Sequence, residues 1–254
     1  MNNPPRYFFW LPWIGTFSIL FIWEMTHFFE WISPTIFPGP LTVLQAGFLE
    51  IPLPRLLEHI GASLSRVTKG FLLGAVLGIS LGITAGWYRR FGNVLRAPIE
   101  LLRPIPPLPW IPLSIIWLGL GEASKVLIIF FGSFFPIFTN TFKGMVNVDP
   151  ILMRAGQALG LKGSRLLLQV AIPATAPDIA IAIRVGFTYS FGAMVAAELI
   201  NSKSGLGYLI MNARDFGQIA IVIFGILMIG TLSLLVDFIL QWIINRKLRW
   251  MRVQ

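Results

Sequence analysis

The side chains that could do chemistry are few in this sequence, and their spacing excludes several reactions. There is no cysteine, and His27 and His59 are the only histidines, so we expect no metal site. No segment has the GxxxxGK[ST] spacing of a phosphate-binding loop, and the nearest fragments, residues 121–125 and 160–164, lack it. No paired carboxylates or nucleophile with a nearby base occur among the apolar segments. We therefore expect neither an enzyme nor a chain that holds a cofactor.

Three charged side chains lie inside long apolar segments, namely Arg184, Glu198 and Asp237. A charge at the centre of a membrane helix costs roughly 2.5–3.5 kcal/mol, so each of them needs a partner or water. Arg184 could attract an anion, but its place near one end of its segment favours a side chain that snorkels to the membrane surface. For Glu198 we expect pairing with Lys203 or with backbone donors.

Neutral donors and a proline-rich passage complete a candidate translocation path. The neutral donors Thr188, Tyr189 and Ser190 lie in the middle of the same apolar segment as Arg184. They could contact a transported molecule or form ordinary interhelical hydrogen bonds, and we weigh the two alternatives equally. The prolines at 104–112 must leave the backbone partly non-helical, which is tolerated at membrane depth only where protein shields it or a wet cavity is lined. The alternative is a cytoplasmic proline turn. The candidate path residues are Trp110, Trp117, Arg184, Thr188, Tyr189, Ser190 and Glu198.

The composition places these residues in a membrane protein. Hydrophobic residues make up 56% of the 254 residues and charged residues 12%, against roughly 45–50% and about 25% in soluble domains. The net charge of +9 does not indicate nucleic-acid binding, because the cations lie between apolar runs rather than on one basic face.

Hydropathy predicts an all-α, polytopic protein with six transmembrane helices. Residues 1–54 are expected to form an N-terminal span, uncleaved rather than a signal peptide, and an external proline-rich connector. Residues 55–254 form a core with five spans. Glycines at 70, 74, 78, 82 and 86 line one face of the second span and permit close helix contact. The predicted spans are Tyr7–Phe28, Val67–Trp87, Trp110–Leu120, Val126–Phe142, Pro177–Ile200 and Ile219–Ile244, with polar loops at 89–103 and 202–218.

Charge distribution sets the orientation. Most Lys and Arg residues fall on the side that holds both termini and residues 149–173, so the positive-inside rule places that side in the cytoplasm. Lipid is therefore the surrounding medium for the spans.

Residues 149–173 form a polar, regular interruption between apolar segments. Asp149 can cap a helix with Pro150 in its first turn, and Gly160 offers a left-handed stop. Ser164 can cap a second helix, which we expect to end at Pro173. The pattern predicts a helix, a glycine turn and a second helix on the cytoplasmic side.

The same stretch resembles the EAA loop of ABC importer permeases, EAA-x3-G-x9-I-x-L-P. Ala155, Gly160 and Val170-x-Ile172-Pro173 match its spacing, whereas Arg154 replaces the usual Glu and Gly156 the second Ala. Further runs resemble the nitrate, sulfonate, taurine and bicarbonate branch, with the alkanesulfonate and taurine permeases closest: Leu102–Leu113, Ile116–Lys125, Ala196–Ile200 and Gly205–Tyr208.

This resemblance implies a type I ABC importer permease fold in a bacterial cytoplasmic (inner) membrane. It implies a homodimer, two separate ATPase subunits that bind ATP and Mg, and an external substrate-binding protein that selects the cargo. An ion-coupled secondary transporter is the alternative, but no internal repeat of its usual kind is visible. The residues implied to couple to the ATPase are Ile151, Leu152, Arg154, Ala155, Gly156, Gln157, Leu159, Gly160 and Pro173.

Overall fold

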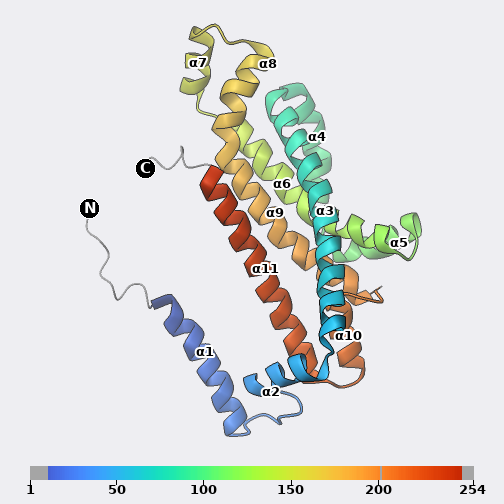
Figure 1. The fold of residues 1–254 in the computed structure, drawn as a ribbon. Helices are drawn as coiled ribbons and strands as arrows, with labels where there is room; N and C mark the ends of the chain where they lie inside the picture. Colours follow the sequence, from blue (N-terminus) through green and yellow to red (C-terminus); the bar gives the residue numbers. More distant parts are fainter. Residues whose placement is uncertain (1–10, 201, 248–254) are drawn as a thin grey trace.

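The computed structural model describes residues 11–200 and 202–247, and this part of the chain consists of helices and connecting turns (Figure 1). The all-α prediction is confirmed. The predicted start of the first span, Tyr7, lies outside the described residues. The helices are α1 (Leu11–Phe28), α2 (Pro40–Gln45), α3 (Leu53–Trp87), α4 (Arg89–Leu102), α5 (Ile111–Leu118), α6 (Glu122–Val146), α7 (Pro150–Ala158), α8 (Gly163–Leu166), α9 (Ile172–Ile200), α10 (Leu206–Asp215) and α11 (Ile219–Lys247).

Within the described residues, four helical segments are long and apolar enough to cross a membrane: Leu53–Trp87, Glu122–Val146, Gly163–Ile200 and Ile219–Lys247. They contain the second, fourth, fifth and sixth predicted spans. The predicted loop at 202–218 is partly wrong, because α10 occupies most of it.

The predicted third span, Trp110–Leu120, is wrong. A 3₁₀ turn at Leu108–Trp110 and the eight residues of α5 form one short apolar helix, which rises only about 16 Å of the ~30 Å hydrocarbon core. Residues 103–107 are not helical, as the prolines predicted, and Gly119 ends α5 with a φ of 76°. The preceding 89–103 segment is not a loop but mostly the amphipathic helix α4.

The close contact predicted from the glycines of α3 is confirmed, and α6 is the partner. For each glycine, the atom nearest to a built Cβ belongs to a different residue of α6, and both sets of residues ascend together along the chain. The pairs are Gly70 with Ile129, Gly74 with Ser133, Gly78 with Ile137, Gly82 with Thr141 and Gly86 with Met145. α3 and α6 are therefore parallel, so α4 and α5 must carry the chain back from Trp87 to Glu122.

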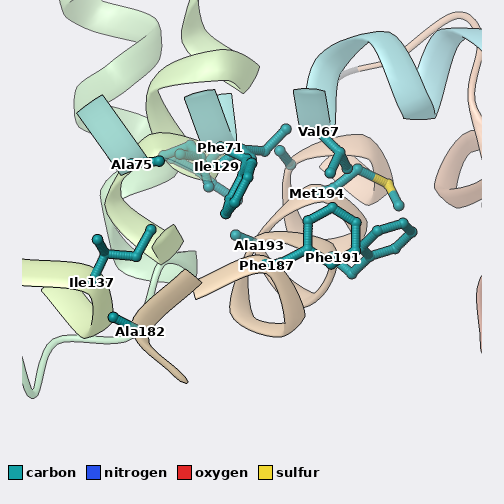
Figure 2. Close-up of a cluster of buried hydrophobic side chains, with 13 residues drawn as sticks. Val67, Phe71, Ala75, Ile129, Ile137, Ala182, Phe187, Phe191, Ala193 and Met194 are labelled. Atoms are coloured by element: carbon teal, nitrogen blue, oxygen red, sulfur yellow. The ribbon is translucent and has the colours of Figure 1, made fainter. Parts of the chain in front are cut away.

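α9 packs against both helices of this pair through an aromatic core (Figure 2). Phe187 of α9 lies edge-on to Phe71 of α3, with ring centroids 5.3 Å apart, and Phe191 follows one turn later. Two backbones meet closely where Gly132 of α6 faces Ala193. A second cluster joins α2, α10 and α11 at the other end of the bundle. The bundle of α3, α6 and α9 thus connects the end that carries α7 and α8 with the end that carries α2 and α10 (Figure 1).

Candidate functional site

The predicted loop at 149–173 begins as its sequence indicates. Oδ1 of Asp149 accepts a hydrogen bond of 2.7 Å from the backbone N–H of Ile151, and Pro150 occupies the first turn of α7. Gly160 follows α7 with a φ of 84°, the left-handed conformation that favours glycine. α7 and α8 project from one end of the bundle, opposite α2 and α10 (Figure 1).

One face of α7 packs on the helical segment that follows it. A Cβ on Gly156 would lie 2.8 Å from Cδ1 of Leu166 and 2.9 Å from Cγ2 of Val170. A methyl group at residue 156 would therefore require the ends of these two side chains to shift. This contact holds α7 against the start of the long segment that contains α9.

The other faces of α7 and its C-terminal turn are exposed. Leu159 is 83% exposed and Ile151 65%, and Leu152 is exposed as well. Arg154 makes only a weak 3.3 Å bond to the carbonyl of Pro150, and Ala155 and Gln157 also face outward. Nothing in the described chain covers these apolar side chains, so α7 presents a short amphipathic surface at the end of the molecule.

The predicted end of the second loop helix at Pro173 is wrong, and so is the Ser164 cap. α8 begins at Gly163 after Lys162, which makes no side-chain cap bond, and Ser164 lies inside the helix. A π turn at Leu167–Ala171 then leads directly into α9, with Pro173 in the first turn of α9. Because the wider π turn shifts the bonding pattern, a residue without an N–H fits here. α7 is thus seated on one continuous helical segment, Gly163–Ile200.

Glu198 lies in a buried polar network at the opposite end. Its side chain is 1% exposed and accepts bonds from Ser63 Oγ (2.9 Å), Arg66 Nη1 (2.7 Å) and the backbone N–H of Gly207 (2.9 Å). The predicted backbone donor is present, but the predicted partner Lys203 is wrong, because Arg66 on α3 takes its place. The carboxylate is fully satisfied without a cargo.

Arg66 also ties α6 into this network. Its Nε and Nη2 bind the carboxylate of Glu122 at 2.6 and 2.8 Å, and Lys125 Nζ binds the same carboxylate at 2.9 Å. Hydropathy alone does not distinguish Arg66 from an ordinary charge in the loop before the second span. The missed signal is its position four residues before Gly70, which continues the glycine face of α3.

Arg184 and Asp237 form a two-bond ion pair between α9 and α11. Nε to Oδ1 measures 3.0 Å and Nη2 to Oδ2 2.8 Å. The expectation that each charge needs a partner is therefore confirmed. Nε and Nη2 of the Arg184 guanidinium therefore already bind the Asp237 carboxylate, in the positions where an anion would bind.

The remaining candidate path residues differ in their exposure and contacts. Ser190 is buried and donates to the carbonyl of Phe187 at 2.6 Å, whereas Thr188 and Tyr189 are exposed. Trp110 packs on Phe131 with ring centroids 4.8 Å apart. Trp117 is exposed on α5.

A large cavity that the sequence did not predict lies beside α7. It has a volume of about 830 Å³ and is bounded by the end of α3, by α4, by the second half of α6 and by Met153 of α7. Several basic side chains of α4 line it. It is a second feature, besides the α7 surface, at this end of the molecule.

Four helical segments long and apolar enough to cross a membrane, within the described residues, define a polytopic membrane protein. The chain belongs to the family described as "binding-protein-dependent transport system inner membrane component", which it matches over residues 74–249. It is therefore a membrane permease of an ABC importer and is not itself an enzyme.

Individual relatives agree with this family. An ABC transporter permease protein of Methanocaldococcus jannaschii is 43% identical over 237 residues, covering 91% of this chain and 88% of that one. A protein named as an aliphatic sulfonates transport permease of Bacillus subtilis is 36% identical, with 91% and 84% covered. The taurine transport system permease protein of Escherichia coli is 32% identical, with 93% and 88% covered.

A solved structure shows the same fold. A chain of the MetNI methionine ABC transporter in an inward-facing conformation superposes with a TM-score of 0.68 at 17% identity, covering 77% of this chain and 99% of that chain. At this identity the likeness concerns the helical arrangement alone.

Proposed function

We propose that this chain forms the translocation path of an importer for a small anion or zwitterion of the sulfonate, taurine, nitrate or bicarbonate class. The names of the relatives from Bacillus subtilis and Escherichia coli support the class. A second copy of the chain, two ATPase subunits carrying ATP and Mg, and an external binding protein complete the transporter. The exposed apolar surface of α7 is the observation that carries the proposal.

The proposed topology has six crossings, with both termini in the cytoplasm. Residues 1–54 supply the first crossing and an external connector, and residues 55–254 the other five. The parallel packing of α3 and α6 supports this count, because two parallel crossings require a return between them. α4 and α5 together make that return in place of a single apolar helix.

Coupling between the ATPase and the membrane helices then depends on the packing of α7 against the segment that leads into α9. In this proposal α7 sits in a groove of the ATPase, with Ile151, Leu152 and Leu159 buried there and Gly160 shaping the turn that follows α7. When ATP closes the ATPase pair, α7 moves with it, and the continuous segment Gly163–Ile200 carries the motion to α9. The two permease copies thereby shift between an inward-facing and an outward-facing opening of the path.

The test is to place a charge on the α7 surface without disturbing the fold. Leu159→Asp changes a side chain that is 83% exposed, so the permease should still fold and insert. We expect ATP-dependent uptake in proteoliposomes, and stimulation of the ATPase by the loaded binding protein, to fall by about tenfold or more, since several apolar contacts are lost.

Phe216→Asp is the matched control, because Phe216 is 74% exposed and directly follows α10, which lies at the end of the bundle opposite α7 (Figure 1). Unchanged uptake and stimulation in Leu159→Asp would contradict the role of α7. Wild-type uptake that survives ATP depletion and collapses with an ion gradient would instead support the secondary transporter.

A further inference from the structure

The cavity beside α7 gathers positive charge from two helices. Arg89, Arg96 and Arg103 line it from α4 and from the residue after its C-terminus. They are spaced by seven residues, about two helical turns, so they share one face. Lys143 lines the cavity from α6. Basic side chains from two elements thus converge on one space of about 830 Å³.

Among the described residues of this lining only one carboxylate occurs, and it is already engaged. Glu100 binds Arg96, with Nε and Oε1 2.8 Å apart. No ion pair in the described part of the chain involves Arg89, Arg103 or Lys143. The cavity therefore has an excess of positive charge that the described residues do not neutralise.

The positive-inside rule alone does not account for this arrangement. That rule concerns how many Lys and Arg residues lie on one side, not whether they surround a cavity. Arg90 shows the difference, because it adjoins Arg89 on α4 but does not line the cavity. The lining also offers the neutral groups Asn93 and Thr139 and the apolar rings of Phe138 and Phe142. Such walls suit a small molecule with an anionic head and a short apolar part.

We propose that this cavity binds the cargo at the coupling end of the path, and that the cargo is an organic anion rather than a zwitterion. The inference rests on the proposed import function and names the substrate class. An anionic head, such as a sulfonate, meets Arg89 and Lys143, which no carboxylate engages; Arg103 lies about 21 Å farther along the helix and does not share this contact. The ammonium group of a zwitterion finds no free carboxylate in the lining, because Glu100 is held by Arg96.

The binding test uses the full-length chain in nanodiscs of phosphatidylcholine, titrated calorimetrically with methanesulfonate. We expect saturable binding that weakens about tenfold or more in Arg89→Gln and in Lys143→Gln, since each removes a charged contact. Arg90→Gln should stay within about twofold of the wild type, because Arg90 is outside the lining. Taurine should bind about tenfold more weakly than methanesulfonate.

Absent binding, or equal weakening in Arg90→Gln and Arg89→Gln, would overturn the site. Equal binding of taurine and methanesulfonate would overturn the anionic class. Nanodiscs that contain phosphatidylglycerol separate a lipid headgroup from a soluble anion. If that lipid abolishes methanesulfonate binding by the wild type, the occupant is a lipid and the cargo assignment fails.

Uptake by the complete transporter separates this inference from the proposed function. If the wild type shows no ATP-dependent uptake of any sulfonate, the proposed function fails, whatever the calorimetry shows. If the wild type transports a sulfonate and Arg89→Gln and Lys143→Gln transport it as fast as Arg90→Gln does, only the cavity inference fails. Slower uptake in the two cavity variants alone supports it.

Discussion

At the scale of single residues, the Arg66 and Glu198 pair is the costliest feature to disturb. Both side chains are almost fully buried, at 4% and 1% exposure, and the pair links α3 with α9. Taking charges out of water is expensive, so a buried pair contributes little net stability. Removing one partner is different, because the other charge stays buried without compensation.

We therefore expect Arg66→Met to lower the free energy of unfolding by about 3–5 kcal/mol. Arg96→Met is the control, since Arg96 and its partner Glu100 are both exposed and such a surface pair contributes little to stability. Unfolding of the purified protein in detergent, followed by circular dichroism, measures both. Equal losses in the two variants would show that the network does not stabilise the fold.

The sequence predicted that Glu198, Arg184 and Asp237 need partners, but it identified none of the partner side chains correctly. The need follows from desolvation, which depends only on the surrounding hydropathy. The partner depends on which helices become neighbours. Arg66 lies 132 positions from Glu198 along the chain, so only the packing of α3 on α9 brings them together.

At the scale of elements, the contact between α3 and α6 depends on the missing side chains of the glycines. A methyl group on Gly70 would lie 2.6 Å from Cβ of Ile129 and 3.0 Å from the carbonyl oxygen of Val126. A Cβ atom and a helix carbonyl cannot swing aside, so the two helices would have to separate. Gly61 lies on the same helix, and a methyl group there would have nothing within 4 Å.

Gly70→Ala should therefore destabilise the protein by about 1–3 kcal/mol, as overpacking does. Gly61→Ala should leave stability unchanged or raise it by up to about 1 kcal/mol, because alanine is the better helix former. Thermal unfolding of both variants in detergent provides the comparison. A stability gain in Gly70→Ala would contradict the close contact.

The four long apolar segments were predictable from hydropathy, and a close helix contact of α3 was predictable from its glycines. Both signals depend only on residues near one another in the sequence. Sequence patterns failed where proline and tertiary packing compete. The apolar run after the prolines predicted a span at Trp110 that is too short to cross alone. Pro173 predicted a helix end, yet the π turn before it accommodates the ring and the helix continues. The loop cap at Asp149 and the turn at Gly160 were predictable because both depend on adjacent residues.

At the scale of the whole molecule, the absence of cysteine makes the proposed orientation directly testable. Leu159→Cys places a thiol on the α7 surface, and Phe216→Cys places one at the opposite end. A membrane-impermeant maleimide should label Leu159→Cys only in inside-out vesicles and Phe216→Cys only in right-side-out vesicles. The wild type is the unlabelled control. The reverse pattern would invert the topology.

The even spacing of the α3 and α6 contacts does not by itself fix how the two helices are aligned along their length. Glycines recur every four residues on α3 and their partners every four on α6, so a slip of one turn, about 6 Å, again sets glycines opposite partners. The four-residue spacing alone therefore allows several registers. Such a slip would carry Arg66 away from Glu122 and Lys125 and leave charges stranded in apolar surroundings. The ion pair of Arg66 with Glu122, whose carboxylate Lys125 also binds, therefore selects a single register of α3 against α6.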